Sequence, residues 1–175
     1  MISSLEISFR NQDDLVYVYF TVFHRLDVDN HEKLHTGEYN RILMGFEEIS
    51  HTADWSARVW AEELPLLFKE AARAMNSLSG TAAGTGPRVR RVFETEAPDA
   101  ESLLVAFLSE LLYYQEQENL TFDPFDVRVA TQWLKVEMEG APIASSEKAI
   151  KAVTYHNLKI VKTPQGFETT IVFDV

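Results

Sequence analysis

Apolar residues recur along this chain with two different periods, and each period predicts one kind of element. Between residues 63 and 79 they return at every third or fourth position, which places them on one face of a helix. The residues of this face are Leu64, Leu67, Phe68, Ala71, Ala72, Met75 and Leu78. A second helix is predicted from about residue 98 to residue 119, with Asp99 as its N-cap. Its buried face consists of Leu103, Leu104, Phe107, Leu108, Leu111 and Leu112.

Strands are predicted wherever β-branched and aromatic residues gather between turn residues. These segments are 46–50, 55–62, 88–96, 125–131, 133–140, 151–162 and 167–175. The turn residues Thr163-Pro164-Gln165-Gly166 make the last two a predicted hairpin. We therefore expect an α+β fold, in which two amphipathic helices pack on a mainly antiparallel β-sheet in a single domain.

The first 43 residues do not share this regular pattern. We interpret 1–43 as an N-terminal extension and 44–175 as the domain, and Met44 as an alternative start of the protein. Within the extension, the segment 15–23 is rich in residues that favour strands. It is predicted either to form an additional strand or to be covered by a partner.

Composition and charge restrict the classes of function. The chain has 175 residues, no cysteine and a net charge of −11. The lack of cysteine excludes disulfides and thiolate chemistry and fits a reducing cytoplasm. The negative charge argues against direct electrostatic capture of nucleic acid, which needs clustered Lys and Arg. No apolar run approaches the roughly 20 residues that cross a bilayer, so we expect a cytoplasmic protein without a membrane partner.

One short motif suggests a metalloenzyme. His31 to His35 match H-E-x-x-H, in which a helix presents two histidines to zinc and a glutamate acts as the base. The flanking residues are polar, and only His24 or Glu38 offers a third ligand nearby. A zinc metallohydrolase that uses His31 and His35 therefore stays as an alternative function.

A different candidate site combines a turn with the end of the chain. Asp54 ends the His51-Thr52-Ala53-Asp54 turn between two predicted strands, where an aspartate often only shapes the turn. The last strand ends in Asp174 and Val175. Carboxylate and carbonyl oxygens suit Ca²⁺ or Mg²⁺ better than zinc, provided that the fold brings these residues together.

Three motifs in the same order resemble the archease family, and the resemblance covers residues 44–175. The motifs are G-F-E-E-I-S-H-T-A-D at 45–54, K-A-V-T-Y-H at 151–156 and V-F-D-V at 172–175. The resemblance implies a small α+β protein that serves as cofactor of the GTP-dependent RNA-splicing ligase in tRNA splicing. Such proteins promote guanylylation of the ligase's histidine and support multiple turnover, so RNA is contacted only indirectly.

The resemblance also implies roles for particular residues. A metal site is expected at Asp54, Asp174 and Val175, holding a divalent cation, with Ca²⁺ expected and Mg²⁺ or Mn²⁺ as alternatives. Lys151 is expected to take part in activation of the ligase. Catalytic residues are not expected, because such a protein assists an enzyme. A chaperone or specificity modulator of RNA-modifying enzymes stays open as a second function.

Overall fold

A computed structural model describes the chain in four segments. The backbone is described for residues 5–11, 14–20, 44–49 and 55–175, and the side chains for 44–49 and 55–175. By its internal contacts the chain divides into two compact units, Met1–Ile42 and Leu43–Val175.

The described residues of the first unit, 5–11 and 14–20, form an antiparallel strand pair. Its strands are β1 (Leu5–Asn11) and β2 (Asp14–Phe20). The strand predicted within 15–23 is therefore present as β2. The strand β1 was not predicted. Its sequence mixes polar and apolar residues, and β1 is a strand through its pairing with β2.

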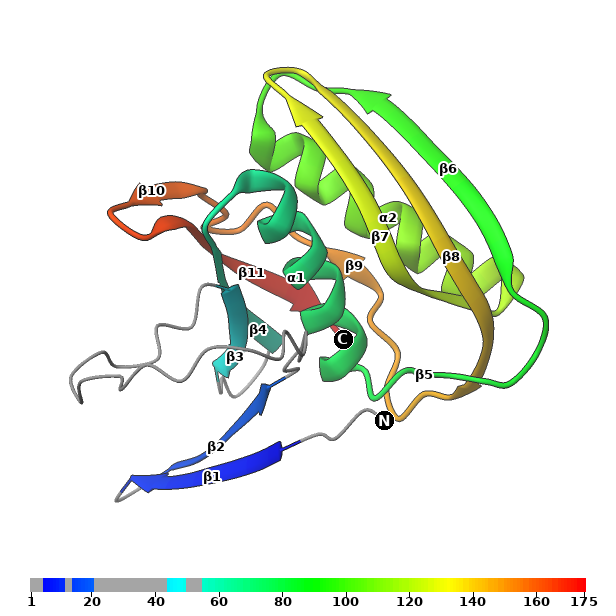
Figure 1. Cartoon of the computed structure of the whole chain (residues 1–175), viewed down its shortest axis with the longest axis horizontal. Coiled ribbons are helices and arrows are strands. Elements are labelled where there is room, and N and C mark those ends of the chain that lie inside the picture. The colour runs from blue at the N-terminus through cyan, green and yellow to red at the C-terminus, as the bar shows by residue number, and fades with distance from the viewer. Residues whose placement is uncertain (1–4, 12–13, 21–43, 50–54) are drawn as a thin grey trace, which may run out of the picture. The chain divides into compact units, whose positions relative to one another are not determined.

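The second unit contains both predicted helices (Figure 1). Its elements are β3 (Met44–Ile49), β4 (Trp55–Ala61), α1 (Leu64–Leu78), β5 (Ala82–Ala83), β6 (Val89–Glu96), α2 (Ala100–Glu118), β7 (Leu120–Ala130), β8 (Trp133–Ser145), β9 (Ala152–Val153), β10 (Val161–Thr163) and β11 (Gly166–Asp174). Asp99 caps α2 as predicted, because its side chain accepts a hydrogen bond from the Ser102 N–H at 2.7 Å. Hydrogen bonding from Ser102, first from its side chain and then from this N–H, holds the pKa of the Asp99 carboxyl below its usual value.

The strands of this unit form two antiparallel sheets. One has the order β10-β11-β4-β3, with β9 added beside β11. In the other, β8 lies between β6 and β7 and also pairs with the short β5. The α+β class and the antiparallel pairing are confirmed, with the strands shared between two sheets (Figure 1).

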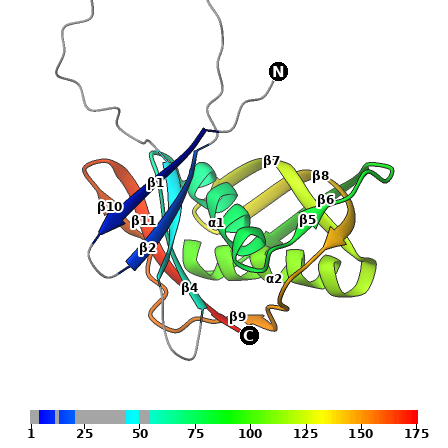
Figure 2. The same ribbon diagram turned by 90° about the horizontal axis from the view of Figure 1, so that it is seen from below.

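The two helices join these sheets into one core. Helix α1 packs on β3 and β4 and also contacts β7, whereas α2 lies across β6 and β7 (Figure 2). The ring of Phe107 in α2 stacks on Phe68 of α1, with centroids 6.3 Å apart. It also meets Phe125 of β7 edge-on at 5.7 Å. All three rings are buried, so Phe107 links both helices to the second sheet.

The prediction of one strand over 151–162 is wrong. Only β9 and β10 are strands there, and the chain turns between them. The Leu158 N–H donates to the Tyr155 carbonyl at 3.2 Å, and Asn157 has φ +54°, in the left-handed region that asparagine tolerates. His156 therefore lies exposed in a turn rather than in a strand.

The predicted hairpin at the end of the chain is confirmed. Thr163 at the end of β10 pairs with Gly166 at the start of β11. Gly166 has φ +131°, and a Cβ atom there would collide with the Ala61 carbonyl oxygen. Glycine is therefore required for β11 to approach the end of β4.

We expect a protein of residues 44–175 to fold without the first 43 residues. Both helices, both sheets and the Phe107 ring cluster lie within that range. Circular dichroism should show the same helical signal per molecule as the full chain, and one cooperative thermal transition. An insoluble product, or a melting curve without a cooperative transition, would mean that the first 43 residues are an integral part of the domain.

Candidate functional site

The end of β11 is held by strands on both sides (Figure 1). Phe173 pairs with Trp55 of β4 on one side and with Val153 of β9 on the other. The Phe173 side chain is fully buried, whereas the next residue, Asp174, is exposed. The alternation of a strand therefore fixes the backbone in the core and presents the Asp174 carboxylate at the surface.

Lys151 joins the K-A-V-T motif to the end of the chain. Its backbone N–H donates to the Asp174 carbonyl at 2.8 Å, and its ammonium Nζ donates to the main-chain oxygen of Val175 at 2.7 Å. Thr154 adds two bonds to the Val172 carbonyl, from its N–H at 3.0 Å and from its hydroxyl at 3.1 Å. Three residues predicted for the site, Lys151, Asp174 and Val175, are therefore neighbours.

The segment that leads to Lys151 is anchored on α1. The carbonyl of Ser79, just beyond α1, accepts hydrogen bonds from the backbone N–H groups of Glu147 at 2.9 Å and Lys148 at 3.2 Å. The Lys148 ammonium lies 4.4 Å from the centre of the Trp55 ring, a cation–π contact. These contacts fix the approach to Lys151, which itself remains exposed.

The oxygen atoms at the end of β11 are compatible with a hard divalent cation. They are the exposed Asp174 carboxylate and the Val175 oxygen, which already accepts a bond from the Lys151 ammonium. Ca²⁺, Mg²⁺ and Mn²⁺ all bind such oxygens. Among the described side chains no group of three His, Asp or Glu residues could hold a metal ion.

Two predictions fall on residues that the structure does not describe. Asp54, the third expected metal ligand, lies outside the described residues, as do His31 and His35 of the H-E-x-x-H motif. The metal site and the zinc site therefore stay predictions. In the described part of the chain, neither helix has the length and apolar character needed to cross a membrane.

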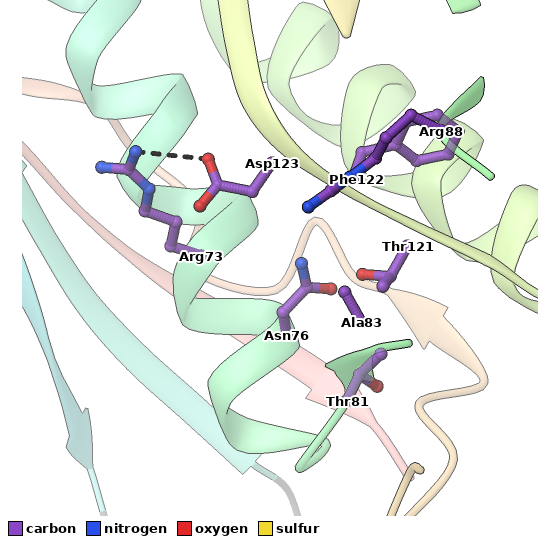
Figure 3. Close-up of a pocket in the computed structure, with 8 residues that line it drawn as sticks. All are labelled: Arg73, Asn76, Thr81, Ala83, Arg88, Thr121, Phe122 and Asp123. Atoms are coloured by element: carbon purple, nitrogen blue, oxygen red, sulfur yellow. Dashed lines mark hydrogen bonds and ion pairs between the residues drawn. The ribbon is translucent and has the colours of Figure 1, made fainter. Parts of the chain in front are cut away.

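A polar pocket lies elsewhere in the unit, between α1, the segment 81–88 and the start of β7 (Figure 3). Its volume is about 360 Å³, and two arginines, Arg73 and Arg88, line it. Sequence reasoning missed this pocket, because its residues come from three separate segments that share no motif.

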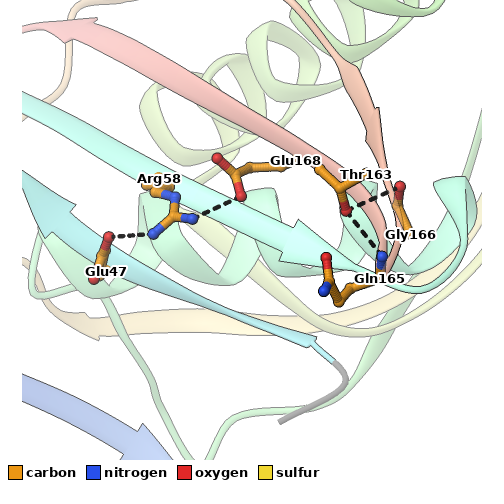
Figure 4. Close-up of polar contacts among 6 residues, drawn as sticks. All are labelled: Glu47, Arg58, Thr163, Gln165, Gly166 and Glu168. Atoms are coloured by element: carbon orange, nitrogen blue, oxygen red, sulfur yellow. Dashed lines mark hydrogen bonds and ion pairs between the residues drawn. The ribbon is translucent and has the colours of Figure 1, made fainter. Parts of the chain in front are cut away.

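A second feature missed from the sequence is an ion-pair cluster across the first sheet (Figure 4). The Arg58 guanidinium of β4 lies 2.7 Å from the Glu168 carboxylate of β11 and 3.0 Å from the Glu47 carboxylate of β3. The bond to Glu168, and then the bond to Glu47, raises the pKa of Arg58 above its ordinary value. The cluster stabilises the strand order β3-β4-β11, although such exposed pairs contribute only about 0–1 kcal/mol each.

These features define a class of protein: a small α+β domain that gathers a lysine and an aspartate at the end of its last strand. A family model described as the Archease protein family matches residues 46–175. A "Protein archease" of Methanosarcina barkeri is 35% identical, with 74% of this chain and 95% of that protein covered. A "Protein archease" of Pyrococcus furiosus is 31% identical, and the match covers 69% of this chain and 91% of that protein. The chain belongs to the archease family.

Solved structures show the same fold. The solution structure of a Methanobacterium thermoautotrophicum protein matches with a TM-score of 0.56 at 23% identity and covers 75% of this chain and 99% of that one. A Thermotoga maritima crystal structure, described as an archease and possible chaperone, matches with a TM-score of 0.55 at 20% identity. The match covers 83% of this chain and 100% of the Thermotoga maritima chain.

Proposed function

We propose that this chain is the protein cofactor of a GTP-dependent RNA-splicing ligase and acts in tRNA splicing in the cytoplasm. It would promote guanylylation of the ligase's histidine and allow multiple turnover. The observation that carries this proposal is the pairing of two archease motifs in space, where Lys151 bonds both Asp174 and Val175. Membership of the family supports it.

The proposed metal site consists of Asp54, Asp174 and Val175. Trp55 pairs with Phe173, and in the sequence Asp54 directly precedes Trp55 and Asp174 directly follows Phe173. In the proposed site the Asp54 and Asp174 carboxylates share one cation, and since oxygen–calcium distances are roughly 2.3–2.6 Å, their oxygens lie within about 5 Å of each other. Two carboxylates that close would repel each other by roughly 4 kcal/mol at an effective dielectric constant near 20, and a divalent cation, Ca²⁺ in the first instance, would relieve this repulsion.

Lys151 supplies a positive charge to the same place. Its ammonium, bonded to the Val175 oxygen, partly balances the carboxylates before any metal ion binds. Val175 would contribute an oxygen to the ion, and the exposed Lys151 ammonium beside it would be available to an anionic group of the ligase. A bound ion would stabilise negative charge at the α-phosphate of GTP, where the ligase's histidine takes the guanylyl group and pyrophosphate leaves.

Multiple turnover provides the experimental test of this function. The cognate ligase is mixed with RNA fragments ending in a 2′,3′-cyclic phosphate and a 5′-hydroxyl, with GTP and a divalent metal, and with or without this chain. We expect several joined molecules per ligase with the chain and about one or fewer without it. A yield per ligase that does not change on adding the chain would contradict the proposal.

A general chaperone or specificity modulator of RNA-modifying enzymes is the second candidate. It is favoured by the description of the Thermotoga maritima structure as a possible chaperone. The two functions differ in what they require. A chaperone would raise the yield of folded ligase, whereas an activator would act on ligase that is already folded and pure.

We expect the double variant His31→Ala, His35→Ala to stimulate the ligase as well as the unchanged chain does. Neither histidine falls within the three archease motifs, so neither has a part in the proposed site. Elemental analysis should also find no stoichiometric zinc in the purified chain. Zinc at one equivalent that disappears in the double variant would favour the metallohydrolase instead.

A further inference from the structure

The pocket beside α1 is built separately from the end of β11. It lies between the C-terminal half of α1, the segment 81–88 and the first residues of β7, and it shares no residue with the proposed metal site (Figure 3). Its volume of about 360 Å³ is at the lower end of the range of small-ligand sites. Any ligand that it binds therefore has to be small.

One of its two arginines is already neutralised. The Arg73 guanidinium lies 2.7 Å from the Glu70 carboxylate and 3.3 Å from the Asp123 carboxylate. Burial lowers the pKa of Arg73, but the two carboxylates, Asp123 first, outweigh burial and raise it above its ordinary value. Arg73 therefore stays charged, and it lines one side of the pocket in an ion pair with Asp123 (Figure 3).

The other arginine offers its charge to a ligand. Arg88 lines the pocket on the side away from Arg73 (Figure 3). Within the described part of the chain its side chain makes no hydrogen bond and lies in no ion pair, unlike Arg90 and Arg91, which lie beside glutamates. Arg88 is therefore the arginine of this pocket that has no carboxylate partner among the described residues.

Two further groups can donate hydrogen bonds into the same space. Thr121 is only 5% exposed and lines the pocket, and its hydroxyl has no hydrogen-bond partner among the described residues. The Asn76 amide oxygen accepts a bond from Gln115 Nε2 at 2.8 Å, so its NH₂ group is left to face the pocket. A ligand with acceptor atoms could therefore accept hydrogen bonds from both groups.

We propose that this pocket binds a phosphate group held by Arg88, Thr121 and Asn76. Arg88 supplies a planar fork of N–H donors, Thr121 a hydroxyl and Asn76 an amide, and each comes from a different element. A tetrahedral phosphate has oxygens for donors from several directions, whereas a carboxylate has two oxygens in one plane. The volume of about 360 Å³ leaves room for more than inorganic phosphate, so phosphate esters are tested beside it.

Titration of the full-length, ¹⁵N-labelled chain followed by NMR tests this site. Inorganic phosphate is added up to about 50 mM at constant ionic strength, with chloride as the reference anion. We expect saturable shifts of the amide signals around Asn76, Arg88 and Thr121. Adenosine 5′-monophosphate and a short RNA with a 3′-phosphate are then compared with the same RNA ending in a 3′-hydroxyl. Whichever phosphate ester binds more tightly than inorganic phosphate identifies the source.

Matched variants decide whether Arg88 and Thr121 make the site. We expect Arg88→Gln to weaken phosphate binding at least about tenfold and Thr121→Val, which keeps the side-chain shape, about threefold or more. Arg90→Gln removes the same charge two residues further on, outside the pocket lining, and should leave the affinity within about twofold.

Three results would overturn the phosphate site. They are the absence of saturable shifts around the pocket, an unchanged affinity in Arg88→Gln, and an equal loss in Arg90→Gln. Each is measured without ligase and without a divalent metal. The phosphate site and the proposed cofactor function can therefore fail independently of each other.

Discussion

Replacing Asp174 by asparagine is expected to lower the affinity for Ca²⁺ at least about tenfold and to remove most of the ligase stimulation. Asparagine keeps the size of the side chain but removes a charge from a site that has few carboxylates. The Asp174 side chain is exposed, and the buried residue at this end of the strand is Phe173. The fold should therefore be retained, with a melting temperature close to that of the unchanged chain.

The matched control for this variant is Asp126→Asn. Asp126 is also an exposed strand aspartate, and its carboxylate lies 3.1 Å from the Arg128 guanidinium on β7. Asp126→Asn changes the net charge of the chain by the same amount as Asp174→Asn. Asp126, however, lies on β7 in the second sheet, away from the end of β11. Calorimetric titration with Ca²⁺ and the ligation assay should show a loss for Asp174→Asn and none for Asp126→Asn. Equal Ca²⁺ affinity in the two variants would remove Asp174 from the proposed site.

Replacing Phe107 by alanine is expected to lower the free energy of unfolding by about 3–5 kcal/mol. The ring is fully buried and contacts both Phe68 and Phe125, so its removal leaves a cavity where α1, α2 and β7 meet. A domain is typically stable by only about 5–15 kcal/mol, so this single change would bring the chain close to unfolding.

Tyr113→Ala provides the control on the same helix. The Tyr113 side chain is 53% exposed, so the same loss of an aromatic ring should cost no more than about 1 kcal/mol. Urea unfolding followed by circular dichroism measures both variants. Similar losses of stability in the two variants would mean that Phe107 is not the centre of the core.

The helices were predictable from the sequence because their signals are local. The i, i+4, i+8 spacing of Leu67, Ala71 and Met75 is visible within a few residues, and so is Asp99 ahead of α2. The prediction of one strand over 151–162 was wrong, because the segment is rich in β-prone residues although the chain turns at Asn157. The division of the strands between two sheets was not predictable either, since it depends on pairings between distant segments.

The sequence motifs indicated which residues belong to the candidate site, but they did not indicate which of these residues contact each other. Asp174, Val175 and Lys151 were found through the motifs, whereas the bond from Lys151 to Val175 depends on β9 pairing with β11. The pocket at Arg88 and Thr121 had no signal in the sequence, because its donors are brought together only by the tertiary structure. The metal-binding role of Asp54, Asp174 and Val175 and the activating role of Lys151 stay predictions.

The most direct test of the central proposal is the rate at which GTP labels the ligase. Purified ligase is incubated with α-labelled GTP and a divalent metal, and the covalent ligase–GMP adduct is measured over time with and without this chain. We expect the initial rate to rise at least about tenfold when the chain is present, and this rise to be lost with Asp174→Asn. An initial rate that is the same with and without the chain would contradict the proposal that it activates guanylylation.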